Sequence, residues 1–250
     1  MVQLHAKTWL DRHLGELPEW QQDAFSQFGD MIADSDRTFP CIPGRQGFLA
    51  DSLRFGFSPD PRTDTAIEEV AALLQQYGEC SRDTGKFASL VIFFQTPDDM
   101  RNDYAVEDYE HLFWSVLSRV SAKDDVAWPG HISTDPSHPS WEFCHSGQPY
   151  FAFCGTPAHQ VRKSRRTSHF LITFQPRWVF AEINDSTPFG RNMKKLIREK
   201  LVAYDGVPAH PSLKWYGQSD NLEWEQYFLR DDDSVAAKCP FHAMHKKGND

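Results

Sequence analysis

Apolar side chains recur at a helical spacing in several stretches of this chain, and each stretch predicts an amphipathic helix. The expected helices cover residues 17–32, 64–77, 106–120, 178–183 and 191–204. Thr63 or Asp64 is well placed to cap the second helix, because its side-chain oxygen can accept a hydrogen bond from a free N–H group of the first turn. The stretch from Phe39 to Gly44 contains two prolines and is expected to interrupt regular structure.

Continuous or alternating apolar residues form a second pattern, which predicts strands. The run over 87–95 is almost wholly apolar, as expected of a central strand that is buried on both faces. Segments 141–145 and 150–154 flank Ser146-Gly147-Gln148-Pro149 and are expected to pair as a hairpin. The remaining extended segments are expected at 53–57, 170–174 and 224–229.

Helices and strands therefore intermingle along the chain, and no internal repeat or low-complexity linker divides it. This order predicts the α+β class, with a mixed, mostly antiparallel sheet and flanking helices in a single domain over residues 1–250. The Pro-rich stretch 128–139 is expected to be a surface loop inside that domain. The segments 1–16 and 243–250 are expected to be flexible ends.

The composition narrows the range of functions. A net charge of −9 argues against general nucleic-acid binding, which needs a basic surface, and favours a cationic small molecule as ligand. Eight Trp and nineteen Phe suit a thick core or walls around a flat aromatic ligand. Neither an apolar signal segment nor a long apolar run occurs, so no membrane association is expected. Five cysteines, an odd number without a CxxC pair, favour reduced thiols in the cytoplasm.

The segment Cys239-Pro240-Phe241-His242 is a candidate metal-binding motif near the C-terminus. Cys and His readily bind transition metals and haem iron. Pro240 favours an extended backbone at Cys239, so the sulfur can project toward a ligand. The alternative is a buried cysteine in a C-terminal turn, which is the usual role of a single cysteine.

A second candidate region follows the hairpin. His159 is either an iron ligand or proton carrier, or a histidine whose hydrogen bonds stabilise a turn. The four cations that follow within five positions are Arg162, Lys163, Arg165 and Arg166. They either form a solvated turn or bind carboxylates or phosphates, haem propionates among them, for which a guanidinium has the matching forked geometry. The chain has no standard nucleotide-binding loop, GxSxG or HExxH motif.

Several unusual strings occur in one order along the chain, and together they resemble the YqcI/YcgG family over essentially its full length. The strings are Phe39-Pro40-Cys41 with Gly44, His138-Pro139-Ser140-Trp141-Glu142-Phe143-Cys144, Thr156-Pro157-Ala158-His159 with Arg162, Ser164 and Arg165, Phe174-Gln175-Pro176-Arg177-Trp178-Val179-Phe180, Tyr204-Asp205, Glu223-Trp224-Glu225-Gln226-Tyr227-Phe228, and Cys239-Pro240-Phe241-His242. His145 departs from the pattern, because an aromatic residue is expected there.

Known members of that family include haem-dependent N-hydroxylases of guanidine groups. One forms hydroxyarginine on the way to D-cycloserine, and another hydroxylates the guanidino precursor of guanitoxin. The resemblance implies haem b as the cofactor and arginine or a related small guanidino compound as the substrate of a monooxygenase. It also implies O2 and an external electron donor, because no flavin or nicotinamide motif is visible. A haem carrier or sensor without oxygenase activity and a metal-free binding domain are the alternatives, and a homodimer is one of the oligomeric states left open.

Within this resemblance, Cys239 is the first choice for the iron ligand, because an axial thiolate favours O–O cleavage. His159 is the alternative ligand, and His242 and Cys41 are lesser candidates. Glu142 is expected to bind the guanidinium of the substrate as a catalytic-site carboxylate. The alternative carboxylates are Glu223 and Asp205. The propionates are assigned to Arg162, Arg165 and Arg177, and the walls around the ring to Trp178, Trp141 and Phe174.

Overall fold

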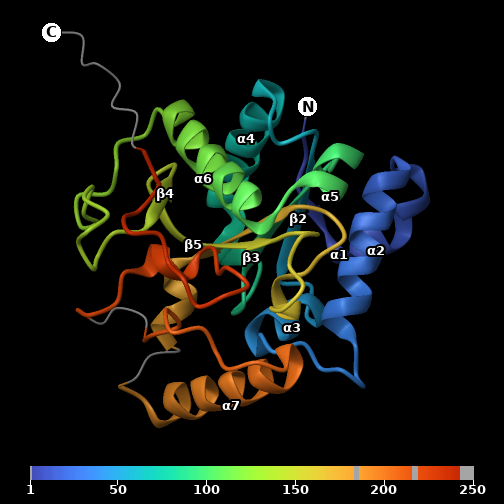
Figure 1. The fold of residues 1–250 in the computed structure, drawn as a ribbon. Helices are drawn as coiled ribbons and strands as arrows, with labels where there is room; N and C mark the ends of the chain where they lie inside the picture. Colours follow the sequence, from blue (N-terminus) through green and yellow to red (C-terminus); the bar gives the residue numbers. More distant parts are fainter. Residues whose placement is uncertain (1, 183–185, 216–218, 243–250) are drawn as a thin grey trace, which may run out of the picture.

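A six-stranded sheet runs through the centre of the computed structural model, which describes residues 2–182, 186–215 and 219–242 (Figure 1). The strands are β1 (His5–Ala6), β2 (Leu53–Ser58), β3 (Ser89–Phe94), β4 (Phe143–His145), β5 (Gln148–Gly155) and β6 (Leu171–Pro176). Their order is β1-β2-β3-β6-β5-β4, and every neighbouring pair is antiparallel except β2 and β3. The expected α+β class, with a mixed and mostly antiparallel sheet in one domain, is confirmed.

The helices that flank the sheet are α1 (Lys7–His13), α2 (Glu19–Ala33), α3 (Ile42–Leu49), α4 (Asp64–Cys80), α5 (Asp98–Asp103), α6 (Val106–Lys123) and α7 (Pro188–Asp205). Short 3-10 helices join them: η1 (Leu14–Glu16), η2 (Ser81–Asp83), η3 (Lys163–Arg165), η4 (Arg177–Glu182) and η5 (Glu223–Gln226). Helix α4 begins as expected, because the Thr63 hydroxyl accepts a hydrogen bond from the backbone N–H of Ala66 at 3.2 Å. No helix in the described ranges is both long and apolar enough to cross a membrane.

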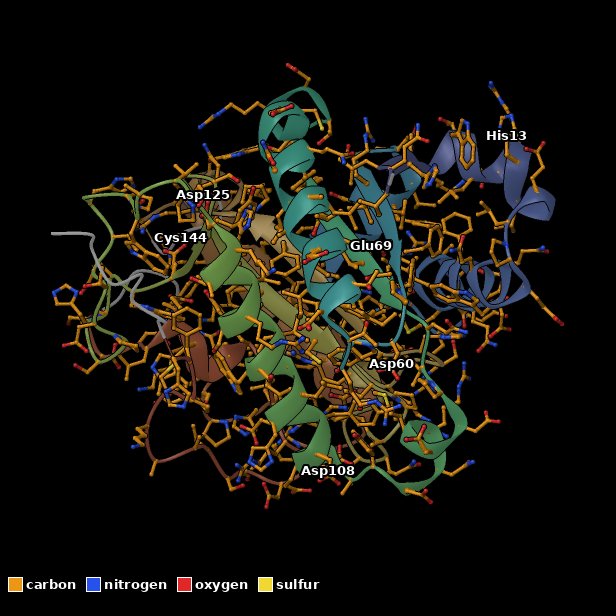
Figure 2. The ribbon with its side chains drawn as sticks, turned by 90° about the horizontal axis from the view of Figure 1, so that it is seen from above. His13, Asp60, Glu69, Asp108, Asp125 and Cys144 are labelled. Atoms are coloured by element: carbon orange, nitrogen blue, oxygen red, sulfur yellow. The ribbon has the colours of Figure 1, made fainter. Side chains whose placement is uncertain are left out.

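The pleat of the strands divides the interior into two cores on opposite faces of the sheet. Leu90 and Ile92 of β3 belong to the core that packs against α4 and α6, two helices that lie side by side over one face (Figure 2). Val91 and Phe93 of the same strand point the other way, into the core formed with α2 and α3. Helix α7 also lies on this second side, away from α4 and α6 (Figure 1).

Two expected loops are partly regular structure. Helix α3 begins inside the stretch Phe39–Gly44, with Cys41 as the N-cap residue and a proline in the first turn. Proline is tolerated there because the first N–H groups of a helix have no partner within the helix. The hairpin turn is shorter than expected, since β5 begins at Gln148; Ser146 and Gly147 carry it with φ angles of 50° and 72°.

Three further expectations are corrected. The segment expected to be extended at 224–229 overlaps the 3-10 helix η5, and the helix expected at 178–183 is the 3-10 helix η4 as far as residue 182. The N-terminal segment 1–16 is not a free end in its described part: β1 pairs with β2, and Leu10 of α1 is buried. The expected flexible end at 243–250 lies outside the described residues.

Candidate functional site

An apolar cavity of about 300 Å³ lies between the α2–α3 side of the sheet and helix α7. Phe151 and Phe153 of β5 and Leu171 of β6 face it from the sheet, because alternate residues of a strand point to the same side. Ile197 and Leu201 of α7 close it from the other side. The cavity is therefore walled by aromatic and aliphatic side chains, as expected of a site for an organic ligand.

Cys41 lines this cavity from the N-terminus of α3. Its sulfur accepts a hydrogen bond from the backbone N–H of Gly44 at 3.4 Å. Gly44 favours this arrangement, since a Cβ atom at that position would crowd Sγ of Cys41 at 3.1 Å. The side chain is exposed because it faces an open space, yet the surrounding protein desolvates it and raises the pKa of the thiol. The Gly44 N–H and the charge of Arg165 oppose that rise by favouring the thiolate.

Asp205, the last residue of α7, places a carboxylate at the same cavity. It is the single acidic side chain among the described residues that line it. Its oxygens accept hydrogen bonds from the backbone N–H and the hydroxyl of Ser164 at 2.7 and 3.0 Å. A carboxylate has about four acceptor positions, so Asp205 retains acceptor capacity for a ligand. Burial raises the pKa of Asp205, while the Ser164 hydrogen bonds and the nearby Arg162 and Arg165 lower it.

Arg162 and Arg165 border the cavity but use their donors on protein acceptors. Arg165 is buried, with its guanidinium 4.0 Å from the ring centroid of Phe153, and donates to the carbonyl oxygens of Tyr227 and Gln226 at 3.1 Å each. Burial lowers the pKa of Arg165 to about 10, so it stays protonated at neutral pH. Arg162 donates to the carbonyl oxygen of Arg230 and to other acceptors of the 230–233 segment. These two cations fix the chain around the cavity and leave few donors for a propionate.

His159 is buried and has both ring nitrogens in hydrogen bonds. One nitrogen, Nε2, lies 2.9 Å from the carbonyl oxygen of Leu229, which can only accept, so Nε2 carries the proton. The other, Nδ1, then accepts from the hydroxyl of Thr156 at 2.8 Å. Burial lowers the pKa of His159 to about 4. In this arrangement the imidazole stabilises the turn after β5, which is the second of the two roles that the sequence left open.

Cys239 lies on the other side of the sheet from the cavity. It packs against the core formed with α4 and α6 and lies close in sequence to Phe241, whose ring makes tilted contacts with Trp128 and Trp141. Burial raises the pKa of Cys239 to about 12, so the group is a neutral thiol in these surroundings. His242 is exposed, and its backbone N–H donates to the hydroxyl of Ser118. The structure therefore separates the C-terminal motif from Cys41 and the cavity.

The carboxylates Glu142 and Glu223 also lie apart from the cavity lining. Glu142 is buried, and one of its oxygens lies 2.8 Å from Nη1 of Arg177 in an ion pair. Glu223 is buried in a polar cluster, where Oε1 accepts from the side-chain amide of Asn221 at 2.6 Å. Of the three carboxylates that the sequence singled out, Asp205 alone faces the cavity.

The aromatic residues that were expected to surround the haem ring also lie outside the cavity lining. Trp141 and Phe174 belong to the α4–α6 core, and Trp178 lies beneath the guanidinium of Arg82, 5.4 Å from the ring centroid. The aromatic side chains that line the cavity are those of Phe28, Phe39, Phe151, Phe153 and Phe180. The sequence analysis did not single out Phe151 and Phe153, which face the cavity from the sheet. The alternation of β5, with Phe151 and Phe153 on one face and Ala152 and Cys154 on the other, was the signal that could have revealed them.

The chemistry of the residues that line this cavity suits haem. A haem has a flat, largely apolar body and needs a single protein side chain as its axial ligand. The cavity offers aromatic walls, an accessible sulfur at a helix N-terminus, and a glycine beside that sulfur that leaves room for it. Among the described residues no three His, Cys, Asp or Glu side chains form a metal-binding cluster. An axial haem ligand does not require one.

Comparisons with known proteins identify the family to which the chain belongs. The sequence model of the YqcI/YcgG family matches residues 28–242. The chain is 54% identical over 246 residues to the uncharacterized protein YcgG of Bacillus subtilis (strain 168), covering 98% of this chain and 97% of that protein. It is 52% identical over 244 residues to the uncharacterized protein YqcI of the same organism, covering 98% and 96% of the two chains.

A more distant relative carries a functional name. The chain is 34% identical over 232 residues to DcsA of Streptomyces lavendulae, provisionally named an N(omega)-hydroxy-L-arginine synthase, with coverage of 90% of this chain and 85% of that protein. No solved structure matches the fold. The family match over most of the chain, together with relatives of this identity and coverage, shows that the chain belongs to the YqcI/YcgG family.

Proposed function

We propose that this protein is a haem-dependent monooxygenase that hydroxylates a guanidine nitrogen of arginine or a related small guanidino compound. The observation that carries the proposal is the apolar cavity that presents the sulfur of Cys41 and the carboxylate of Asp205 to the same space. The name of DcsA supports the reaction class, since that relative is provisionally named for the hydroxylation of arginine.

The overall reaction balances with two co-reactants. A guanidine N–H bond is replaced by N–OH, one oxygen atom of O2 enters the product, and the other leaves as water. Two electrons and two protons are consumed, and an external reductant supplies the electrons. Haem, when bound, supplies the activation of O2 that a protonated guanidine, a poor nucleophile, requires.

The residues of the chain then have separate tasks. The Cys41 sulfur would hold the iron, and the N–H of Gly44 would stabilise its thiolate form at the helix N-terminus. Asp205 would bind the guanidinium of the substrate, because paired carboxylate oxygens match two parallel N–H donors. Phe151, Phe153 and the apolar side chains of α7 would exclude water from the reacting groups. The proposed ligand role thus passes from Cys239 to Cys41, and the substrate role from Glu142 to Asp205.

The test begins with the visible spectrum of the haem-supplemented protein. Cys41→Ser should lose haem or move the ferrous-CO band away from the position typical of a thiolate ligand. The matched variant Cys239→Ser should keep the wild-type band, because that sulfur lies on the other side of the sheet. The reverse result would return the ligand to the C-terminal motif.

The substrate is tested by mass spectrometry of a guanidine panel incubated with haem-loaded protein, O2 and a reductant. We expect an added oxygen atom on arginine or a close relative, and its loss in Asp205→Asn. Haem binding without any hydroxylated product would favour the carrier or sensor alternative, and the absence of a Soret band would exclude both haem functions.

A further inference from the structure

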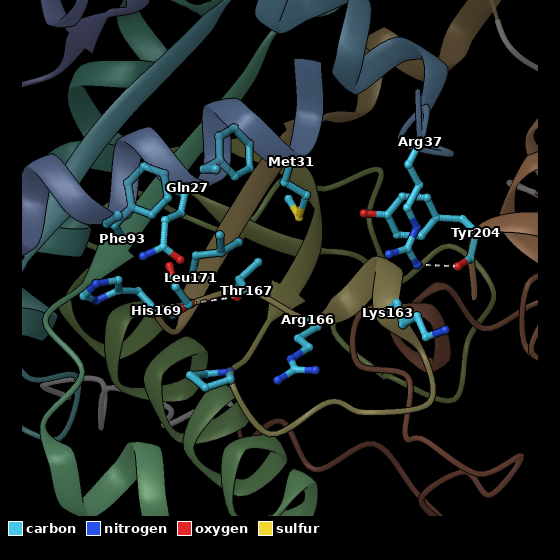
Figure 3. Close-up of a pocket in the computed structure, with 14 residues that line it drawn as sticks. Gln27, Met31, Arg37, Phe93, Lys163, Arg166, Thr167, His169, Leu171 and Tyr204 are labelled. Carbon is cyan, nitrogen blue, oxygen red and sulfur yellow. Dashed lines mark hydrogen bonds between the residues drawn. The ribbon is translucent and has the colours of Figure 1, made fainter. Parts of the chain in front are cut away.

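A second hollow, of about 580 Å³, lies beside the apolar cavity. Figure 3 shows the side chains that line it. Its floor is formed by α2 and the sheet, and its rim by the loop between β5 and β6 and by the end of α7. The side chains of Arg37, Lys163 and Arg166 line it, and we call it the cationic groove. None of the described residues lining it is an Asp or a Glu, although the whole chain has a net charge of −9.

Two of the three cations in this groove have no ion-pair partner among the described residues. Lys163 and Arg166 are exposed and make no ion pair or side-chain hydrogen bond within the described part of the chain. Arg37 donates to the carbonyl oxygen of Tyr204 at 2.8 Å and lies 4.2 Å from the centroid of that ring, which holds the guanidinium at the groove (Figure 3). Two acids precede Arg37 on the same segment: Asp36 is exposed, and the half-buried Asp34 accepts the backbone N–H of Arg37 through its carboxylate.

The groove and the apolar cavity are neighbours. Phe28, Met31, Thr167 and Leu171 line both of them, so a group bound in one space lies close to a group bound in the other. One space is apolar and the other is rich in free cations. The complementary ligand has an apolar body and at least one carboxylate, for which Arg and Lys are the usual partners.

We propose that the cationic groove binds the carboxylate of a molecule whose body occupies the neighbouring cavity. This inference deepens the proposed function, since the propionates of haem and the carboxylate of a guanidino acid both have the required chemistry. It assigns the carboxylate to Arg37, Lys163 and Arg166, in place of Arg162 and Arg165, whose donors already bind main-chain carbonyl groups.

The first arm of the test uses metal-free protoporphyrin IX and its dimethyl ester, so that iron–sulfur bonding does not contribute. Fluorescence titration compares the full-length wild type with Lys163→Gln/Arg166→Gln. The control variant, Arg12→Gln/Lys238→Gln, makes the same change in net charge at two exposed positions outside the groove. We expect the groove variant to bind the diacid roughly fivefold more weakly or worse, and the ester to bind both proteins equally. The control should match the wild type.

The second arm measures the binding of arginine and of agmatine, its analogue without the carboxylate, to the same haem-supplemented proteins by calorimetry. A preference for arginine that the groove variant abolishes would identify the substrate as the source of the carboxylate. A preference for the porphyrin diacid that the variant abolishes would identify the propionates. If neither probe shows a carboxylate preference that depends on Lys163 and Arg166, the inference is overturned. A charge-dependent porphyrin site in a protein that hydroxylates no guanidine would keep this inference and reject the proposed function.

Discussion

Acidification should destabilise the folded protein through His159. The burial of this imidazole lowers its pKa to about 4, from an ordinary value of 6.5. The unfolded chain therefore binds more protons than the folded chain between these two values, and stability falls as the pH falls through that window. Above about pH 6.5 the neutral ring and its two hydrogen bonds contribute fully; below about pH 4 that contribution is lost.

The magnitude follows from the two pKa values. One pKa unit corresponds to about 1.4 kcal/mol, so the complete loss is about 3 kcal/mol. Between about pH 8 and about pH 5, proton linkage at this one group lowers the free energy of unfolding by about 2 kcal/mol. A loss of that size is a large fraction of the stability of a typical domain.

The assay is urea unfolding at the two pH values for the wild type and for His159→Gln, whose amide can donate to the Leu229 carbonyl oxygen without titrating. The fall in stability between the two pH values should be about 2 kcal/mol smaller in the variant. His131→Gln, at an exposed position, is the control and should fall as the wild type does. Equal falls in all three proteins would refute the reasoning. If His159→Gln does not fold, NMR titration of the wild-type imidazole decides, and a pKa near 6.5 would contradict the buried, neutral ring.

Three further changes test other parts of the site. Tyr227→Phe should lower the free energy of unfolding by about 2–4 kcal/mol, because it leaves the Phe143 N–H and the Tyr150 carbonyl oxygen without their buried partner, and unchanged urea midpoints would contradict this. Gly44→Ala should weaken haem binding with little change in thermal midpoint, because the new Cβ crowds Sγ of Cys41; equal haem affinity by Soret titration would count against Cys41 as the ligand. Amide exchange in α7, where Gly190 and Asp205 are the buried residues among those described, should slow when haem fills the cavity. Exchange that is equally fast with and without haem would argue that α7 does not cover the ligand.

The sequence pattern correctly predicted the strand and the helix whose apolar residues are most completely buried. The continuous apolar run became β3, which is buried along its whole length, and the stripe of α4 became its contact with the sheet. The Thr63 cap was predicted for the same reason, since a cap is decided by neighbours a few residues away. Local rules succeed where the partner of a residue is local or where burial is complete.

The start of α3 shows where a local rule was misapplied. Two prolines and a glycine were read as a break, although proline in the first turn of a helix is favourable and Cys41 can serve as the N-cap. That reading placed Cys41 in a loop and gave it little weight. The better reading of the same letters would have put a sulfur at a helix N-terminus, which is a recognised setting for a reactive thiol.

The choice between Cys41 and Cys239 could not be made from the sequence, because it depends on which face of the sheet each residue meets. Both sulfurs sit in distinctive motifs, and both lie next to a proline or within a few residues of one. Only the tertiary arrangement puts Cys41 in the lining of the same cavity as Phe153 and Asp205, and packs Cys239 against the side chains of the α4–α6 core. Neither motif contains information about that separation.

The tertiary arrangement also decides which cations of one short segment point inward and which point outward. Arg162 and Arg165 alternate with Lys163 and Arg166 around the 3-10 helix η3, whose tight turn points neighbouring side chains in different directions. The inward pair binds main-chain carbonyl groups and holds the 226–233 segment against the cavity. The outward pair keeps its charges for the groove. A cluster that reads as a single basic patch thus has two functions that substitution can separate: loss of the inward pair should cost stability, and loss of the outward pair should cost affinity for carboxylates alone.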